Sequence, residues 1–482
     1  MIKMKRISIL AGSFAVAATV QAAQKPNIIF VMTDDQGYGD LACHGHPYVK
    51  TPNIDKLYSE STRLTDYQVS PTCAPTRSAI MSGRYPFRTG VTHTILERER
   101  MNLNETTIAE VLKSSGYTTG IFGKWHLGDE KPYQPGSRGF DEVFMHGAGG
   151  IGQKYPGSCA DVPNNKYFDP VIRHNGSFVK TKGYCTDIFF KQALGWIKKN
   201  KSRPFYAYIC TNAPHGPFIA PEKYKKMYEK SAPKSKQANF YGMITNIDDN
   251  MGLLMKKLDE WNLSENTLLV FTTDNGSSAG DFNAEMKGKK NSVNEGGTRV
   301  PAFLRFPGKF PAGKDIDQLT RHVDFFPTLA ELAGATPAKP LDGKSLLPLL
   351  TGKSDKWQDR MTYFHIGRWG KKGDTSRWGK ISSDLTKEKY RNFAVRSENW
   401  RMVGKNELYD LRHSHLEKEN VISKHPEVAV EMLKAYEKWW EEMRPLMINE
   451  TVPLAKEAPY HADYHKQKNS AGIPEWVEPA VD

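Results

Sequence analysis

Four apolar segments that end in polar or charged side chains constrain the fold more than any other feature of the sequence. They are NIIFVMTDD (27–35), TTGIFGKWHLG (118–128), PFYAYICTNAPHGPF (204–218) and TLLVFTTDNG (267–276). Short, continuous apolar runs bounded by turn residues are typical of strands buried on both faces of a sheet. Segments with helical patterns, such as 104–116 and 243–261, lie between them. This alternation predicts an α/β fold with a large, mostly parallel sheet sandwiched by helices.

Residues able to do chemistry stand at the ends of these segments. They are Asp34 and Asp35, Lys124 and His126, His215, and Asp274 and Asn275. Open α/β sheets bind ligands beyond the carboxyl ends of their strands, so we expect these side chains to share one rim. Clustered carboxylates repel each other unless a cation lies among them, and oxygen ligands suit Ca²⁺ or Mg²⁺ better than zinc. The basic side chains nearby, with Arg77, would add a pocket for an oxyanion such as sulfate or phosphate.

The segment SPTCAPTRSAIMSGRYPFRTG (70–90) places Cys73 among turn formers, hydroxyls and arginines. From the residues alone, four roles for Cys73 are open: a thiolate nucleophile, a metal ligand, half of a disulfide, or a site of covalent modification. The chain has five cysteines, so at least one is unpaired. Cys159 and Cys185 flank a polar loop and could pair, whereas Cys210 ends an apolar strand and favours a buried thiol.

The N-terminus predicts a secretory signal peptide over residues 1–22. Basic residues precede an apolar run at 7–20, which is short for a membrane span, and small residues follow it. We therefore expect a periplasmic or secreted protein with no membrane span in its mature form. The net charge of +13 favours an anionic partner, and in that compartment an acidic or sulfated polysaccharide is more natural than nucleic acid.

Two further segments follow the main unit, which we expect to be a catalytic domain over residues 23–355. Residues 356–448 contain three stretches with strand and hairpin patterns and then a helical pattern at 426–443. They predict a smaller α+β subdomain in which an antiparallel sheet packs against that helix. Residues 449–482 are rich in proline and polar side chains, which predicts an extended tail.

The motif CAPTRSAIMSGRYPFRTG (73–90) resembles the signature of the formylglycine-dependent (type I) sulfatases, which belong to the alkaline-phosphatase-like superfamily. The resemblance covers nearly the whole mature chain. It continues, in the order of the family, in NIIFVMTDDQGYGDLACHGHPYVKTPNIDKL, GKWHLG, NAPHGPF, TTDNG, NEGGTRVP and ELYDL. Within this family, the sequence most resembles the bacterial polysaccharide sulfatases in its general features. The resemblance implies a sulfuric ester hydrolase with an alkaline-phosphatase-like fold.

The resemblance also implies roles for individual residues. Cys73 matches the cysteine that a formylglycine-generating or sulfatase-maturating enzyme converts to 3-oxoalanine (formylglycine), whose hydrate is the nucleophile and contacts the metal. The family's ligands for one Ca²⁺ match Asp34, Asp35, Asp274 and Asn275. The positions that support the formylglycine, contact sulfate or transfer protons match Arg77, Lys124, His126, His215 and Lys290. Thr76 stands where many members have serine.

Chemical reasoning agrees with these roles. Sulfur is a poor ligand for Ca²⁺, whereas an aldehyde hydrate supplies two hydroxyls. One hydroxyl would attack sulfur, while His215 and Lys290 would protonate the departing sugar oxygen. His126 would take the proton of the second hydroxyl, so that collapse to the aldehyde expels sulfate.

The sequence says less about the alcohol to which the sulfate is esterified. Our leading hypothesis is a carrageenan-type sulfated galactan, and a glycosaminoglycan is the next candidate. GRWGKKGDTSRWGK (367–380) interleaves basic and aromatic residues that could contact sugars, including Arg368, Trp369, Arg377 and Trp378, although a solvated loop has the same composition. His44, His46 and the Gly-rich segment 144–153 could also line the substrate site, and structural roles would suit both histidines equally well.

Two other classes of function remain open. A phosphonate or phosphodiester hydrolase of the same superfamily would share the catalytic residues, and paired sulfate and phosphate esters of one alcohol would distinguish it. A non-catalytic binder of anionic glycans would bind without turnover and keep an unmodified Cys73.

Overall fold

The computed structural model describes residues 25–481 except 96–97, 154–158, 355, 369–384 and 448–456. The expected signal peptide lies outside the described residues, as do Trp369, Arg377 and Trp378. Within the described ranges, no helix has the length and apolar character needed to cross a membrane.

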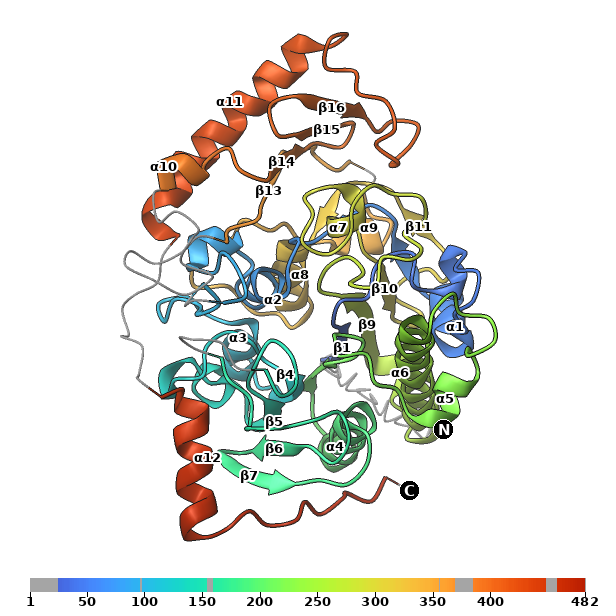
Figure 1. Ribbon diagram of the computed structural model, residues 1–482, viewed down its shortest axis with the longest axis vertical. Helices are drawn as coiled ribbons and strands as arrows, with labels where there is room; N and C mark the ends of the chain where they lie inside the picture. Colours follow the sequence, from blue (N-terminus) through green and yellow to red (C-terminus); the bar gives the residue numbers. More distant parts are fainter. Residues whose placement is uncertain are drawn as a thin grey trace, which may run out of the picture.

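A ten-stranded sheet forms the centre of the fold (Figure 1), with the strand order β11-β2-β10-β9-β1-β8-β4-β5-β6-β7. Its middle is parallel and contains β9 (Thr267–Thr273), β1 (Asn27–Thr33), β8 (Phe205–Cys210), β4 (Thr118–Lys124) and β5 (Glu142–His146). Each of the four apolar segments of the sequence contributes one of these strands. β1, β8 and β9 are buried along their whole length, which is why they lack a polar face.

The edges of the sheet are mostly antiparallel. On one side lie β10 (Ala302–Arg305), β2 (Thr62–Leu64) and β11 (Asp315–Ile316), and on the other β6 (Val171–His174) and β7 (Ser177–Lys180). β10, β6 and β7 pair antiparallel, whereas β11 pairs parallel with β2. The expectation of a mostly parallel sheet is confirmed. A small separate ladder joins β3 (Tyr67–Gln68) to β12 (Thr320–Arg321).

Helices cover both faces of the sheet. Successive side chains of β1 point to opposite faces and pack against different helices. Ile29 and Val31 pack in the same apolar cluster as α1 (Pro52–Glu60), α4 (Cys185–Asn200) and α6 (Ser235–Glu260). Phe30, which points to the opposite face, packs with side chains of the other helical layer. That layer is made of α2 (Cys73–Ser82), α3 (Ile108–Ser114) and α8 (Phe325–Leu332).

Shorter elements fill the connections. They are α5 (Glu222–Lys226), α7 (Glu295–Thr298), α9 (Leu347–Leu350) and the 3₁₀ turns η1 (Ala42–His44), η2 (Pro86–Thr89), η3 (Lys131–Tyr133), η4 (Pro135–Arg138), η5 (Ser264–Asn266), η6 (His322–Asp324) and η7 (Arg444–Leu446).

The C-terminal unit is a four-stranded antiparallel sheet with one long helix, at the top of Figure 1. Its strands are β13 (Thr362–His365), β14 (Phe393–Arg396), β15 (Trp400–Val403) and β16 (Glu407–Asp410), with α10 (Leu385–Glu388) before β14. α11 (Pro426–Met443) covers the sheet and buries Tyr436 and Trp440 against Phe393 and Met402. This confirms the expected antiparallel sheet and helix.

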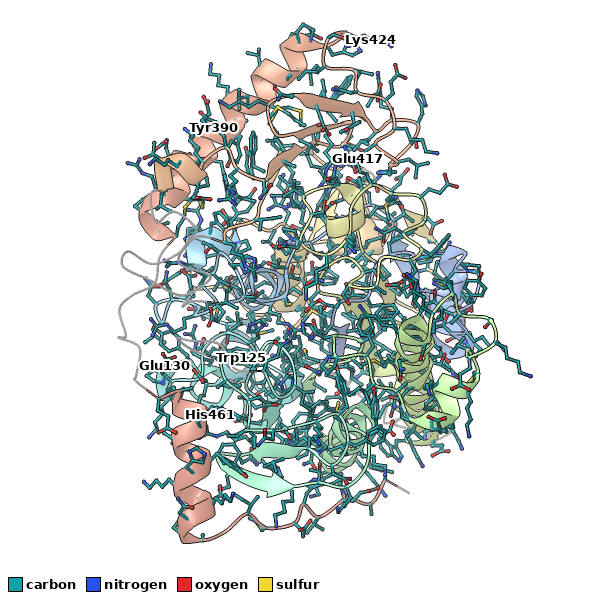
Figure 2. The ribbon with its side chains drawn as sticks, viewed as in Figure 1. Trp125, Glu130, Tyr390, Glu417, Lys424 and His461 are labelled. Atoms are coloured by element: carbon teal, nitrogen blue, oxygen red, sulfur yellow. The ribbon has the colours of Figure 1, made fainter. Side chains whose placement is uncertain are left out.

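Buried ion pairs join this unit to the unit that contains the ten-stranded sheet. Glu295 of α7 accepts hydrogen bonds from Arg396 of β14 at 3.1 Å and from Arg401 of β15 at 2.5 Å. Arg396 also binds Asp66, at 2.5 Å, between β2 and β3. Glu417 lies at the same boundary (Figure 2), where it accepts the backbone N–H of Glu295 at 2.9 Å.

Two expectations need correction. The tail is not simply extended, because residues 459–470 form α12 (Pro459–Ser470) beside the β5–β7 edge. Only Tyr460 and His461, near its start, are buried, so the helix lacks the apolar stripe that reveals a helix in a sequence. The proposed pairing of Cys159 with Cys185 is also wrong, since all five cysteines are free thiols.

Candidate functional site

Parallel pairing of β1 with β9 brings the acidic residues together. Thr33 and Thr273 are register partners, so Asp34 and Asp35 leave the sheet beside Asp274 and Asn275. The backbone N–H of Asp35 donates to Asp274 Oδ1 at 3.0 Å, and the Asn275 amide donates to Asp35 Oδ1 at 3.0 Å. All four residues are at most 1% exposed. The shared rim expected from the sequence is therefore present.

Each carboxylate of this group has its own cationic partner. Lys124 Nζ lies 2.7 Å from Asp34 Oδ2, Lys290 Nζ 2.6 Å from Asp35 Oδ2, and Arg77 Nη2 2.7 Å from Asp274 Oδ2. Burial alone would raise the pKa of Asp35, but Lys290 and His215 outweigh it and hold that pKa below its usual range. The three carboxylates and their cationic partners form a buried network of alternating charges, which holds these side chains in fixed positions.

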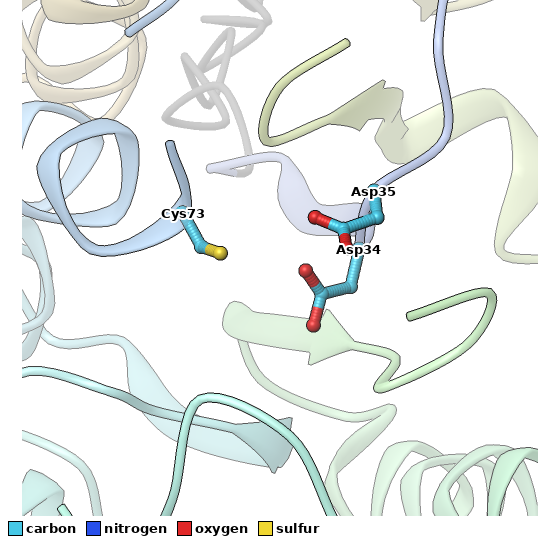
Figure 3. A group of neighbouring side chains, drawn as sticks. All are labelled: Asp34, Asp35 and Cys73. Carbon is cyan, nitrogen blue, oxygen red and sulfur yellow. The ribbon is translucent and has the colours of Figure 1, made fainter. Parts of the chain in front are cut away.

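Two oxygens of this rim have no hydrogen-bond partner. Asp34 Oδ1 and Asn275 Oδ1 are both buried and unpaired, and an orphaned buried acceptor costs about 1–3 kcal/mol. Burial and the neighbouring Asp274 carboxylate raise the pKa of Asp34 well above its usual value, so the pocket is short of positive charge there. Ligand atoms of Asp34, Asp35 and Cys73 lie within 4.8 Å of one another (Figure 3). The carboxylate and amide oxygens of Asp34, Asp35, Asp274 and Asn275 fit a hard divalent cation such as Ca²⁺.

Helix α2 carries Cys73 to the edge of this group. Cys73 is the first residue of the helix, is 2% exposed, and faces the two aspartates (Figure 3). Burial raises the pKa of its thiol to about 12 in spite of Lys124 and Lys290, so the residue is not a thiolate near neutral pH. Arg77 stands one turn later on the same helix and donates to the backbone oxygen of Lys124 at 3.2 Å.

A cavity of about 200 Å³ opens over Cys73. Its lining includes His126, His215, Lys290 and Arg368, all of which the sequence had singled out. It also includes residues that the sequence had not singled out individually, namely Thr72, His93, Thr94, Ile95, Gly149, Gln153 and Asn291. The strongest available signal for these was their position next to recognised motifs, because Asn291 follows Lys290 directly and Thr72 precedes Cys73.

Two of the three histidines that line the cavity, His126 and His215, each present a ring nitrogen that carries no hydrogen. His126 Nε2 donates to the Thr94 carbonyl at 3.1 Å, which leaves Nδ1 as the acceptor, buried and unpaired. His215 Nδ1 donates to the Gly216 carbonyl at 2.7 Å, and its Nε2 lies 3.6 Å from Asp35 Oδ2. Burial lowers the pKa of His215 to about 4 and holds the pKa of His126 well below its ordinary value. Both rings are therefore neutral near pH 7 and poised to accept a proton.

Glycines of the 144–153 segment make room for these rings. A Cβ on Gly149 would stand 2.6 Å from His126 Cε1, and one on Gly150 would stand 2.8 Å from His215 Cε1. Side chains at these two positions would displace the imidazoles. The segment is thus a wall of the cavity, as the sequence suggested.

His44 and His46 do not line the cavity. The His44 ring stacks on Tyr38 with 3.9 Å between the centroids, and its Nδ1 donates to the Tyr38 carbonyl at 2.7 Å. His46 Nδ1 accepts the backbone N–H groups of Tyr48 and Val49 at 3.1 and 3.0 Å. Both histidines stabilise local turns, which is the structural role that the sequence had left open beside a place in the substrate site.

Comparison with known proteins places these features in a family. A family model described as Sulfatase matches residues 26–335, and one described as N-sulphoglucosamine sulphohydrolase, C-terminal, matches residues 288–443. N-acetylgalactosamine-6-sulfatase of Canis lupus familiaris is 31% identical over 373 residues, which are 72% of this chain and 69% of the relative. Arylsulfatase A of Homo sapiens is 32% identical over 376 residues, 71% of each chain.

Solved structures give the same result. The crystal structure of Ps i-CgsB in complex with k-i-k-neocarrahexaose superimposes with a TM-score of 0.77 at 30% identity, over 89% of this chain and 96% of that chain. The phosphonate monoester hydrolase of Agrobacterium radiobacter superimposes with a TM-score of 0.65 at 20% identity, over 89% of this chain and 97% of that one, which is a likeness of fold.

Proposed function

The chain belongs to the sulfatase family and is a sulfuric ester hydrolase, and on this premise we propose that it removes sulfate from a sulfated carbohydrate with Cys73 in its 3-oxoalanine (formylglycine) form. One observation carries the proposal. The buried, protonated Cys73 faces two carboxylates that are already paired with lysines, in a cavity lined by three neutral histidines. A thiol with a pKa of about 12 is a poor nucleophile and a poor ligand for a hard cation, whereas an oxygen at the same position suits both tasks.

The four rim residues Asp34, Asp35, Asp274 and Asn275 would hold one Ca²⁺. When bound, the ion would withdraw electron density from the sulfate oxygens and favour the ionised form of a hydroxyl beside it. Cys73, as the hydrate, would add an oxygen ligand to this set.

The remaining steps belong to lysine and histidine side chains around Cys73. Lys124 and Lys290 would bind the sulfate oxygens and stabilise the charge that grows on them. Although burial lowers the pKa of Lys290, Asp35 raises it above its ordinary value, so Lys290 stays protonated and can donate a hydrogen bond to the departing sugar oxygen. His215, neutral at rest, would first take up a proton at Nε2 and then pass it to that oxygen. The bare Nδ1 of His126 would accept the proton whose removal lets sulfate leave.

The substrate is proposed to be a carrageenan-type sulfated galactan. The likeness to Ps i-CgsB, whose complex contains k-i-k-neocarrahexaose, supports this choice at 30% identity. A glycosaminoglycan is the second candidate, which the C-terminal match to the N-sulphoglucosamine sulphohydrolase model and the likeness to N-acetylgalactosamine-6-sulfatase favour. In either case we propose an exported protein, periplasmic or secreted, that relies on a formylglycine-generating or sulfatase-maturating enzyme.

Mass spectrometry of the peptide that contains Cys73 tests the mechanism. Protein from a host with a working maturation system should show sulfur replaced by oxygen and the loss of two hydrogens. An intact thiol in that protein would contradict the mechanism. Sulfate release from defined carrageenan and glycosaminoglycan oligosaccharides then tests the substrate, and phosphate and phosphonate esters of one alcohol, compared with its sulfate ester, test the phosphonate or phosphodiester alternative.

A further inference from the structure

Among the cavity residues that the mechanism above does not use are His93, Asn291 and Arg368. They come from three separate parts of the chain, namely the loop after η2, the loop after Lys290 and the segment after β13. They line the same cavity as Cys73 and Lys290.

Hydrogen bonds fix the backbone of all three. The N–H of His93 donates to the Arg98 carbonyl at 3.2 Å, and the N–H of Asn291 donates to the Pro71 carbonyl at 2.9 Å, two residues before Cys73. The N–H of Arg368 donates to the Ile366 carbonyl at 2.8 Å. Thr92 then ties the first segment to the third, because its hydroxyl donates to the Gly367 carbonyl at 3.2 Å. These residues therefore form a fixed wall of the cavity.

The wall offers hydrogen-bonding groups. His93 Nδ1 lies 3.0 Å from Thr94 Oγ1, whereas Nε2 is buried and has no hydrogen-bond partner. Burial, reinforced by the Arg368 and Lys290 charges, holds the pKa of His93 well below its ordinary value, and the Asn291 amide opposes this only in part. His93 is thus a neutral ring, suited to a sugar hydroxyl or a ring oxygen.

The charge of the cavity favours an anion beyond the sulfate that is cleaved. Among the described residues that line the cavity there is no carboxylate, and the ammonium of Lys290 is paired with Asp35. Arg368 adds a guanidinium, whose planar fork matches the oxygens of a sulfate or carboxylate.

We propose that Arg368, with His93 and Asn291, forms a subsite for a second anionic group of the substrate, a sulfate or a carboxylate on the same sugar or its neighbour. Arg368 binds the anion, while His93 and Asn291 orient the ring that carries it. This inference rests on the proposed function and deepens it, since it assigns the enzyme a substrate with at least two negative groups.

Substrate pairs test the subsite. Each pair contains one cleavable sulfate and differs only in a second sulfate or, in a separate arm, in a uronic acid carboxylate. For the wild type we expect kcat/KM to be about 10- to 100-fold higher on the member with the second anion, as befits a charge-assisted contact. R368Q should bring this ratio close to one, mainly through KM, and R368K should retain part of it because a point charge replaces the fork. The arm in which the preference appears identifies the anion.

One control variant and one further test variant keep the experiment decisive. R391Q removes an arginine that pairs with Glu388 at 3.5 Å and does not line the cavity, so its ratio should equal that of the wild type. N291D places a negative charge in the wall and should lower the ratio further by repulsion. If R368Q and N291D both fold, as judged by thermal unfolding, and both keep the wild-type ratio, the subsite is refuted.

A binding experiment separates this inference from the proposed function. Calorimetric titration of C73A and of C73A/R368Q with the same sugar pairs needs no turnover. A preference for the second anion that C73A shows and C73A/R368Q lacks supports the subsite even if the wild type releases no sulfate. Equal binding of both sugars by C73A overturns it, even in a protein that proves to be an active sulfatase.

Discussion

Lys290 places its ammonium 2.6 Å from Asp35 Oδ2, across 255 residues of sequence. Lys287, only three positions earlier, turns away and pairs with Glu407 of β16 at 2.7 Å. Two lysines of one short loop therefore bind different parts of the molecule, Asp35 and Glu407. Alanine variants of the two lysines form a matched pair.

K290A should lower kcat/KM for sulfate release by about 100- to 1,000-fold, because it removes a charge aimed at the sulfate oxygens. K287A removes the same charge from an ion pair at the surface and should stay within about 3-fold of the wild type. Release of nitrophenol from an aryl sulfate measures both. Equal losses in the two variants would contradict the assignment of Lys290.

Removal of divalent ions should lower the melting temperature as well as the activity, because Asp34 Oδ1 and Asn275 Oδ1 then lose the partner we assign to them. Ca²⁺ at 100 times its Kd would stabilise the fold by about 2.7 kcal/mol. Thermal unfolding with chelator and with added Ca²⁺ measures this effect. D34N should abolish the Ca²⁺-dependent shift, and a shift that survives in D34N would place the ion elsewhere.

The hydroxyl of Thr76 fixes the turn in front of Cys73, since it accepts the Ser70 N–H at 3.0 Å and donates to the Ser70 carbonyl at 3.3 Å. T76S keeps both contacts and should have nearly wild-type stability. T76V leaves two buried backbone groups unpaired and should lose about 1–3 kcal/mol of unfolding free energy in denaturant titration. Equal stability of T76S and T76V would refute this role.

G149A should displace the His126 ring and lower kcat by about 10- to 100-fold, since small errors in the position of a catalytic group are costly. Gly136 provides the control, because a Cβ there would meet only Val143 Cγ2 at 3.9 Å. G136A should therefore keep its kcat. Single-turnover kinetics of both variants measure the chemical step, and an unchanged rate in G149A would show that the His126 ring has room to move.

The buried Glu295 should make stability depend on pH. Burial alone would raise the pKa of Glu295, but Arg401 and Arg396 outweigh it and hold the pKa well below its ordinary value of 4.5. A depressed carboxyl pKa stabilises the fold above about pH 4.5, and this contribution fades as the pH falls toward the folded-state pKa. E295Q should lose about 3–5 kcal/mol at pH 7, because it leaves buried arginines unpaired.

Thermal unfolding between pH 7 and pH 3 provides the measurement. The gap between the wild type and E295Q should narrow as the pH falls below about 4.5. E419Q removes an exposed carboxylate that pairs with Lys424 at 2.6 Å, and it should follow the wild type at every pH. If the difference in stability between the wild type and E295Q stayed constant with pH, E295Q would destabilise the fold through altered packing rather than through the loss of a charge.

The sequence predicted the residues at strand ends better than those in loops. Asp34, Lys124 and Asp274 could be placed on one rim because parallel strands fix where their carboxyl ends meet. His93 could not, because it stands in a loop whose path depends on distant contacts, such as the bond from Thr92 to Gly367. Arg368 was named only as one of several basic and aromatic residues of its segment that could contact sugars.

His44 shows the opposite error. Its motif lies close to Asp35 in sequence, which suggested a place in the substrate site, but the ring turns back to stack on Tyr38. Helix α12 was missed because it buries little more than its first turn. A periodic pattern reports burial along a whole element, so an element held at one end gives little signal.

The register between β1 and β9 also sets an order of events in time. Asp35 and Asp274 are 239 residues apart, and Cys73 lies between them. In a chain that emerges N-terminus first, the thiol of Cys73 is present long before β9 exists to complete the rim, and contacts this far apart in sequence form slowly. That delay would leave Cys73 accessible to the maturating enzyme that we propose, whereas the residue is only 2% exposed in the finished fold.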